Sequence, residues 1–340
     1  MKGHSLSTVL LAHLSNADGS ELYKVFMSLQ SGVKTLAHLL SRAGMDNLLG
    51  VYEGASSASA DRDEAKRLDI ISNDIIKQAF SASGCISAIA SEEEDNVEHI
   101  DNGMAASSNG QASCEAVFDP LDGSRNIDAG IPTGTIFGIY CSSDGSLDAS
   151  SRPCLQKGKH LVAAGYALYS SATILVLSWG QGVHGFTLDR GSGEFVLTHP
   201  AMRIPARGQI YSVNDARYFD WPEGLRKYID DIRQGKGQNP KQYSARYVCS
   251  LVADFHRTLL YGGVAMNPRS HLRLVYEANP LSYIAEQAGG MGSDGRRRIL
   301  DIQPEKLHQR LPLFLGSPED IAELESYGDV QQIGEKKYTV

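Results

Sequence analysis

The spacing of apolar residues changes along the chain from a helical to a strand-like periodicity. This change restricts the possible folds more than any other feature. From Leu22 to Ala43 the apolar residues recur every three or four positions, as on a helix with one buried face. The stretch EAKRLDIISNDIIKQAF (64–80) has a similar stripe, formed by Leu68, Ile71, Ile75 and Ile76. Both stretches are predicted to be helices.

Short apolar or alternating runs follow these helices, bounded by Gly, Ser, Asp or Pro, and such runs are typical of strands. The runs are CISAIAS (85–91), EAVFDP (115–120), GTIFGIYC (134–141), HLVAAGYALYS (160–170), ATILVLSW (172–179), GVHGFTL (182–188) and GEFVLTH (193–199). Helices in front of a series of strands predict an α+β region over residues 1–202, and the Pro and Gly of RIPARGQ mark its end.

Strands and helices alternate in the remainder, residues 203–340, which predicts an α/β region. The expected strands are QIYSV (209–213), LLYGGVAM (259–266) and LRLVYE (272–277), and the expected helices are PEGLRKYIDDIR (222–233), YVCSLVADFHRT (247–258) and LSYIAEQAG (281–289). No linker separates the two regions, so we expect them to pack closely with the functional site between them.

Composition narrows the possible partners. The formal charge of −8 argues against nucleic acid or an anionic membrane as the main partner, and no apolar run approaches the roughly 18 residues of a membrane helix. The 5 cysteines are Cys85, Cys114, Cys141, Cys154 and Cys249. They have no CxxC spacing, so free or buried thiols in a reducing compartment are expected.

Acidic residues follow two of the predicted strands. SEEED places Glu92 and Glu93 after one strand, and FDPLD places Asp119 and Asp122 at the end of another. Adjacent strands lie about 4.8 Å apart, so two strand ends can bring these carboxylates together. The cluster would repel itself unless a cation occupied it, and oxygen ligands suit Mg²⁺ or Mn²⁺.

A plainer interpretation exists for each acidic stretch. SEEED alone is typical of a solvated acidic loop, and FDPLDGS alone is compatible with a simple turn. Against the second interpretation, Leu121 offers a backbone carbonyl to a metal, and Gly123, Ser124 and Arg125 open a turn whose free N–H groups suit an anion. Metal ligands beside an anion site are the arrangement that phosphoryl hydrolysis requires.

The motif DPLDGS resembles the signature of the magnesium-dependent, lithium-sensitive phosphatases, which include inositol monophosphatases and fructose-1,6-bisphosphatases. Further stretches resemble the fructose-1,6-bisphosphatases (class I), in particular the plant chloroplast second isoform that lacks a redox-regulatory cysteine loop. These stretches are KRLDIISND, SEEE, FDPLDGSRNID, GTIFGIY, LVAAGYALY, ARYVCSLVADFHRTLLYGG, LRLVYEANP and LHQRLPLFLGSPED. The resemblance implies a layered α-β-α-β-α sugar-phosphatase fold and hydrolysis of the 1-phosphate of fructose 1,6-bisphosphate.

The resemblance also implies roles for individual residues. It implies metal ligation by Glu92, Glu93, Asp119, the carbonyl of Leu121, Asp122 and Glu277. It implies that Asp69 and Glu93 accept a proton from the attacking water, and that Asp63 belongs to a loop that closes over the site. The substrate-binding positions are Asp122, Gly123, Ser124, Arg125, Asn214, Arg217, Tyr218, Arg246, Tyr247, Leu251, Asn267 and His271.

Some of these positions depart from the family pattern. His271 stands where the family has a lysine, Asn267 and Arg217 where it has tyrosines, and Arg125 where it has a serine. The two additional guanidinium groups can bind phosphate bidentately and so offset the lost contacts. Our hypothesis is that Arg125 supplies charge at the 1-phosphate. Tyr218, next to Arg217, is an alternative replacement for one lost tyrosine.

The resemblance implies two or three Mg²⁺ ions per subunit, with Mn²⁺ as an alternative. It also implies a homodimer or homotetramer, because in the family the arginine matched by Arg246 reaches a neighbouring subunit. The expected location is the chloroplast stroma, with the cytoplasm as the alternative. Two other functions remain open: a sedoheptulose-bisphosphate or inositol phosphatase, and an inactive sugar-phosphate sensor. The sensor predicts broken metal ligands, whereas the acidic residues are intact.

AMP should inhibit this chain weakly or not at all. Regulated relatives bind AMP through a Lys-Tyr pair and an arginine, and the matching positions here are Ser113, Cys114 and Cys141. Without cationic partners a nucleotide phosphate loses most of its affinity. Titration of AMP against phosphate release measures this, and inhibition at micromolar AMP would contradict it.

Overall fold

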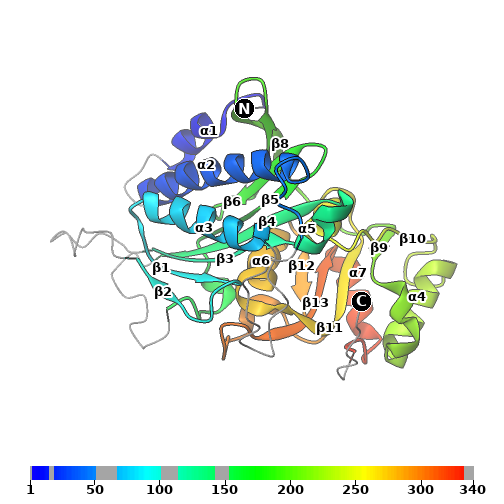
Figure 1. Cartoon of the computed structure of the whole chain (residues 1–340). Helices are drawn as coiled ribbons and strands as arrows, with labels where there is room; N and C mark the ends of the chain where they lie inside the picture. The colour runs from blue at the N-terminus through cyan, green and yellow to red at the C-terminus, as the bar shows by residue number, and fades with distance from the viewer. Residues whose placement is uncertain (1, 15–18, 51–66, 101–113, 142–152, 333–340) are drawn as a thin grey trace.

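Helices and strands alternate in five layers in the computed structural model of the chain, which describes residues 2–14, 19–50, 67–100, 114–141 and 153–332 (Figure 1). The layers are α-β-α-β-α, as expected. The α-helices are α1 (Leu6–Leu14), α2 (Ser20–Arg42), α3 (Arg67–Ala82), α4 (Glu223–Gln234), α5 (Leu251–Tyr261), α6 (Asn279–Gln287) and α7 (Pro318–Ser326).

The larger sheet has eight strands in the order β2-β1-β3-β4-β5-β6-β7-β8. Its strands are β1 (Ile86–Ser91), β2 (Glu98–His99), β3 (Cys114–Asp122), β4 (Thr133–Cys141), β5 (Ala163–Tyr169), β6 (Thr173–Ser178), β7 (Val183–Asp189) and β8 (Glu194–Met202). Strand β1 is parallel to β3, and from β3 to β8 each strand is antiparallel to the next.

The smaller sheet has five strands in the order β10-β9-β11-β13-β12. They are β9 (Ile210–Ser212), β10 (Ser244–Ala245), β11 (Val264–Arg273), β12 (Met291–Ser293) and β13 (Arg310–Gly316). Strand β9 is parallel to both of its neighbours, whereas β11, β13 and β12 are antiparallel.

The first helical layer covers the outer face of the larger sheet through the predicted stripe of α2. Phe26 and Leu29 of α2 pack with Phe80 of α3 and with Phe118 and Phe137 of the sheet in one buried cluster. Removing a side chain of this size from water contributes about 1.5–3 kcal/mol. In α3 the prediction was only partly right, because Ile71 and Ile75 are half-buried and polar residues share the buried face.

The middle layer consists of α5 and α6, which lie between the two sheets (Figure 1). Phe255 of α5 and Ile284 of α6 share a buried cluster with Tyr166 of β5 and Leu313 of β13. The last layer, α4 and α7, covers the far face of the smaller sheet, where Ile229 packs in a cluster with strand residues. These buried clusters hold both sheets in one molecule.

Two predicted strands of the second region are wrong in part. In LLYGGVAM the first residues end α5, and β11 begins only at Val264 after a turn with positive φ at Gly262 and Gly263. LRLVYE is not a strand beyond Arg273, because residues 274–278 form a π-helical turn, η5 (Leu274–Ala278), that leads into α6. A short apolar run does not distinguish a strand from a buried helical turn.

The expectation that the cysteines remain thiols is wrong for one pair. Cys114 begins β3 and Cys141 ends β4, directly opposite in register, and the two form a disulfide with their Cα atoms 4.1 Å apart. They lie 27 residues apart in sequence, so only strand pairing brings them together. Cys85, Cys154 and Cys249 are free.

Some predictions fall outside the described residues. They concern Asp63, Ser113 and the segment 142–152, which belongs to the stretch GIYCSSDGSLDASSRPCLQKGKHLVAAGY (138–166) that we expect to be too short for an inserted regulatory loop. Among the residues with described positions, no helix combines the length and apolar character needed to cross a membrane.

The disulfide should stabilise the fold measurably. Closing a 27-residue separation is worth about 2–4 kcal/mol of unfolding free energy in the loop-entropy model, so Cys141→Ser should lower the urea midpoint accordingly. Thiol titration of the denatured, unreduced protein should find the three free cysteines. Cys85→Ser is the control. Reductant should lower the urea midpoint of this variant by the same amount as that of the unsubstituted protein. Detection of every cysteine as a thiol before reduction would contradict the assignment.

Candidate active site

The predicted acidic residues lie at the ends of two adjacent parallel strands: Glu92 and Glu93 follow β1, and Asp119 and Asp122 lie in the last residues of β3. In the β1–β3 pair Ser91 lies opposite Phe118, and the backbone N–H of Glu92 donates to the carbonyl of Phe118 at 3.1 Å. Parallel strands end at the same edge of a sheet, so Glu92 and Glu93 lie beside Asp119. The position matches the one predicted from sequence.

A bulge in β3 brings both aspartates to one face of the sheet. Asp119 pairs with Ile136 and Asp122 with Gly134, so the stretch has one residue more than the opposing strand. Side chains alternate along a strand, and residues three apart would otherwise point to opposite faces. Pro120, which has no N–H to donate, occupies the irregular position.

Side-chain hydrogen bonds hold the bulge in place. The backbone N–H of Leu121 donates to Asp119 Oδ1 at 3.0 Å, and Thr135 Oγ1 donates to the carbonyl of Pro120 at 2.8 Å. The spacing of the two aspartates in DPLD is therefore explained by the bulge, which places both on one face of the sheet.

Glu277 reaches the cluster from the second region. It lies in η5 rather than at a strand end as predicted, and its carboxylate accepts from the backbone N–H of Arg273. One carboxylate oxygen from each of Glu92, Asp119 and Glu277 lies within 4.8 Å of the others. The site is thus built where the two regions meet.

Burial and mutual repulsion raise the pKa values of these acids. Desolvation is the largest cause of the raised pKa of Asp119, followed by the charge of Glu92. The same two causes, in the same order, raise the pKa of Glu277. Desolvation also raises the pKa of Asp122 to about 7, even though backbone N–H groups, first that of Val252, lower it.

The residues present fit a divalent metal ion. Asp119 is 1% exposed, and its buried Oδ2 has no hydrogen-bond partner among the described residues. A buried carboxylate oxygen without a partner is costly unless a cation occupies the space beside it. The donor set is made of carboxylates, which are hard ligands of the kind that Mg²⁺ and Mn²⁺ prefer.

Asp69 lies in the first turn of α3 and is 6% exposed. One turn later, Asn73 donates to Glu94 Oε1 at 2.8 Å and accepts from Ser91 Oγ at 2.6 Å. These bonds tie the polar face of α3 to the loop that carries Glu93. The pairing of Asp69 with Glu93 as proton acceptors stays a prediction.

The expected anion cradle is the 3₁₀-helix η2 (Ser124–Ala129), which follows Gly123. Gly123 has φ +76°, and a Cβ atom there would lie 3.2 Å from Asn126 Nδ2, so this turn favours glycine. Ser124 is half-buried and Arg125 is exposed. Their contacts with phosphate stay predictions.

The start of α5 packs against Asp122, one of the predicted metal ligands. The backbone N–H of Val252 donates to Asp122 Oδ2 at 3.1 Å. Gly134 allows this approach, because a Cβ atom there would lie 2.5 Å from Val252 Cγ2. Leu251, predicted to bind substrate, is the first residue of this helix.

The remaining predicted substrate residues lie on the second region. Asn214 caps η4 (Asp215–Asp220), which carries Arg217 and Tyr218. The hydroxyl of Tyr218 donates to Asp230 Oδ2 at 2.6 Å.

The other four predicted substrate residues lie on or after strands of the smaller sheet. Arg246 and Tyr247 follow β10, and Asn267 and His271 lie on β11. The roles of all these residues stay predictions.

Sequence reasoning missed Arg273 beside the cluster. This arginine is 7% exposed, and its Nη2 lies 3.9 Å from Glu92 Oε1. Its Nε donates to Tyr276 Oη at 3.3 Å. Arg273 is a charged residue inside the predicted strand LRLVYE, but the sequence does not show that it faces Glu92 of the other region.

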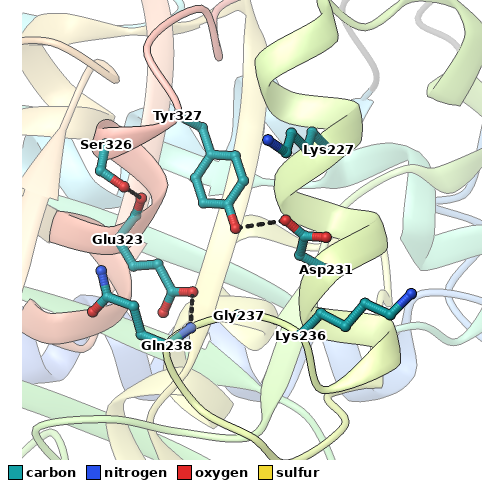
Figure 2. A pocket seen from close by; sticks show the side chains of 8 residues that line it. All are labelled: Lys227, Asp231, Lys236, Gly237, Gln238, Glu323, Ser326 and Tyr327. Carbon is teal, nitrogen blue, oxygen red and sulfur yellow. Dashed lines mark hydrogen bonds between the residues drawn. The ribbon is translucent and has the colours of Figure 1, made fainter.

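A cavity of about 560 Å³ lies away from this cluster, between α4 and α7 (Figure 2). Its polar groups bind one another: Tyr327 Oη donates to Asp231 Oδ2 at 2.9 Å, and the Gln238 N–H to Glu323 Oε1 at 2.7 Å (Figure 2). None of the predicted site residues lines it. We therefore place the chemistry at the carboxylate cluster rather than in this cavity.

Two family models cover most of the chain: "Fructose-1-6-bisphosphatase, N-terminal domain" over residues 6–200 and "Fructose-1-6-bisphosphatase, C-terminal domain" over residues 204–329. The chloroplastic fructose-1,6-bisphosphatase of Brassica napus is 44% identical, covering 96% of this chain and 82% of the relative. The class 1 fructose-1,6-bisphosphatase of Chloroherpeton thalassium is 43% identical, covering 90% of this chain and 87% of the relative.

The holo crystal structure of Leishmania major fructose-1,6-bisphosphatase matches the fold with a TM-score of 0.85 and 38% identity, covering 97% of this chain and all of that one. The layered architecture is thus that of the sugar phosphatases. Within that class, the chain belongs to the fructose-1,6-bisphosphatase family.

Without divalent metal, the free energy of unfolding should fall as pH rises from about 4 to about 7. The folded protein keeps a proton on Asp122, whose pKa is raised from 3.8 to about 7, whereas the unfolded chain has released it. This group alone accounts for at most about 4 kcal/mol. Urea unfolding in chelator measures the change.

Two comparisons control this prediction. Asp122→Asn should reduce the pH-dependent loss, and saturating Mg²⁺ should remove it in the unsubstituted protein. A pH dependence that is unaltered by both treatments would contradict the proposed origin.

Proposed function

We propose that this chain hydrolyses the 1-phosphate of fructose 1,6-bisphosphate, releasing fructose 6-phosphate and inorganic phosphate. The observation that carries the proposal is the cluster of half-buried Glu92 with buried Asp119 and Glu277, in which one oxygen of Asp119 has no hydrogen-bond partner among the described residues. Membership of the family supports the substrate. We treat residues 1–202 as the metal- and phosphate-binding region and residues 203–340 as the sugar-phosphate-binding region.

Mg²⁺ ions, two or three per subunit, with Mn²⁺ as an alternative, would supply positive charge against the phosphate oxygens and acidify the attacking water. The ligands we assign are Glu92, Glu93, Asp119, the Leu121 carbonyl, Asp122 and Glu277.

The protein side of the reaction is proton transfer and positioning. Asp69 and Glu93 accept the proton of the attacking water, and the N–H groups after Asp122 hold the phosphate for in-line attack. We assign Asp63 to closure over the site.

The distal phosphate and sugar are assigned to residues of the second region. They are Asn214, Arg217, Tyr218, Arg246, Tyr247, Leu251, Asn267 and His271. We place Arg125 beside Gly123 and Ser124 at the 1-phosphate, where it supplies a permanent positive charge.

We propose that the chain forms a homodimer or homotetramer. Arg246 is exposed in the single chain, as expected of a side chain that reaches a neighbouring subunit. The chloroplastic relatives favour the chloroplast stroma, whereas the bacterial relative leaves the cytoplasm as the alternative.

Sedoheptulose 1,7-bisphosphate is the second candidate substrate, because the substitutions at Arg217, Asn267 and His271 fall among the residues assigned to the distal phosphate. An inactive sensor is disfavoured, since the acids of the cluster are all present and lie together.

Phosphate release from the fructose and sedoheptulose bisphosphates should be measured in parallel with Mg²⁺. We expect the fructose substrate to give the higher kcat/KM. Asp122→Asn should lower kcat at least about 100-fold, because it removes a ligand charge that acts on the transition state. Asp189→Asn, at the exposed end of β7, is the matched control and should keep full activity. Activity that survives Asp122→Asn would contradict the metal assignment.

A further inference from the structure

A buried ion pair on α5 holds the segment that carries Arg246 and Tyr247. Asp254, one turn into the helix, is 5% exposed. Its Oδ1 and Oδ2 accept from the backbone N–H of Val248 at 3.1 and 3.2 Å, and its Oδ1 accepts from Arg257 Nη2 at 2.6 Å. The helix thus uses a buried carboxylate to fix the chain that precedes it.

Arg257 contacts the backbone of the same segment two residues earlier. The same Nη2 donates to the backbone carbonyl of Arg246, and the Arg257 side chain is 19% exposed. Asp254 therefore fixes the N–H after Tyr247, and Arg257 fixes the carbonyl before it. Charge-assisted hydrogen bonds of this kind are stronger than neutral ones.

Packing contributes little to the placement of the two side chains in between. Tyr247 is 44% exposed, and the guanidinium of Arg246 donates to the carbonyl of its neighbour Ala245 at 2.8 Å. An exposed side chain is directed mainly by its backbone. The backbone contacts of Asp254 and Arg257 therefore help to set where these groups lie in the single chain, together with the hydrogen bond between the Tyr247 and Cys249 side chains.

The far end of the segment is tied to the first region. Asn126 Nδ2, in the expected anion cradle, donates to the carbonyl of Cys249 at 2.7 Å. Cys249 has φ +64°, which costs a non-glycine residue about 1 kcal/mol or more. Such a conformation persists only where surrounding contacts fix it.

The start of the same helix also binds a metal-binding aspartate, through Val252 and Asp122. One helix end thus contacts both the expected 1-phosphate site and the segment assigned to the distal phosphate. We propose that Asp254 and Arg257 are positioning residues that set the distance between these two subsites, and so select bisphosphates over monophosphates. This inference rests on the proposed function.

The test compares fructose 1,6-bisphosphate with fructose 1-phosphate, which lacks the distal phosphate, in Arg257→Met. We expect KM for the bisphosphate to rise about tenfold with kcat within about twofold, as for loss of hydrogen bonds to a charged group. For the monophosphate, kcat/KM should change by less than about twofold.

Control variants separate positioning from general damage. Arg257→Lys should recover most of the KM, because a single nitrogen makes both contacts. Arg298→Met removes another doubly paired arginine and should leave both substrates unaffected. Asp254→Asn repeats the test on the other member of the pair if Arg257→Met does not fold.

Equal losses on both substrates, or no loss on either, would overturn the proposal. Failure of the unsubstituted protein to hydrolyse the bisphosphate at all would instead refute the proposed function.

Discussion

Repulsion among buried carboxylates is the constraint around which this structure is organised. Asp119, Asp122 and Glu277 are 1%, 8% and 6% exposed, and each has a raised pKa because burial and the charge of its neighbours disfavour ionisation. Folding brings these carboxylates close together although their negative charges repel one another. The arrangement becomes favourable once a cation is bound, since binding to the folded state alone stabilises that state. We therefore propose that metal binding at this site stabilises the fold.

The layers of the fold explain how so many acids reach one place. Parallel pairing of β1 with β3 joins Glu92 to Asp119, and the bulge at Pro120 turns the second aspartate to the same face. The middle helical layer then brings the second region into contact, with η5 carrying Glu277 and the start of α5 binding Asp122. Both sheets must be in place before the cluster is complete, so the interface between the regions is part of the site.

Much of this was predictable from sequence, because periodicity reports local structure and acids after parallel strands meet at one edge. The stripe of α2 and the strand-end position of Asp119 followed directly from these patterns. Three features were not predictable, for physical reasons. The π-helical turn holding Glu277 has the apolar character of a strand, and the Cys114–Cys141 bond depends on strand register. Arg273 was hidden because its contact with Glu92 joins two regions.

The central claim is that the carboxylate cluster binds the metal. It is tested most directly by titrating the metal-free protein with Mn²⁺ and measuring the free ion by electron paramagnetic resonance. The account predicts saturable binding of Mn²⁺. Asp119→Asn should weaken this binding at least about tenfold, because it removes the carboxylate whose buried oxygen has no hydrogen-bond partner among the described residues. The variant Asp189→Asn, at the exposed end of β7, should bind Mn²⁺ as the unsubstituted protein does. Unchanged affinity in Asp119→Asn would show that the carboxylate cluster is not the metal site.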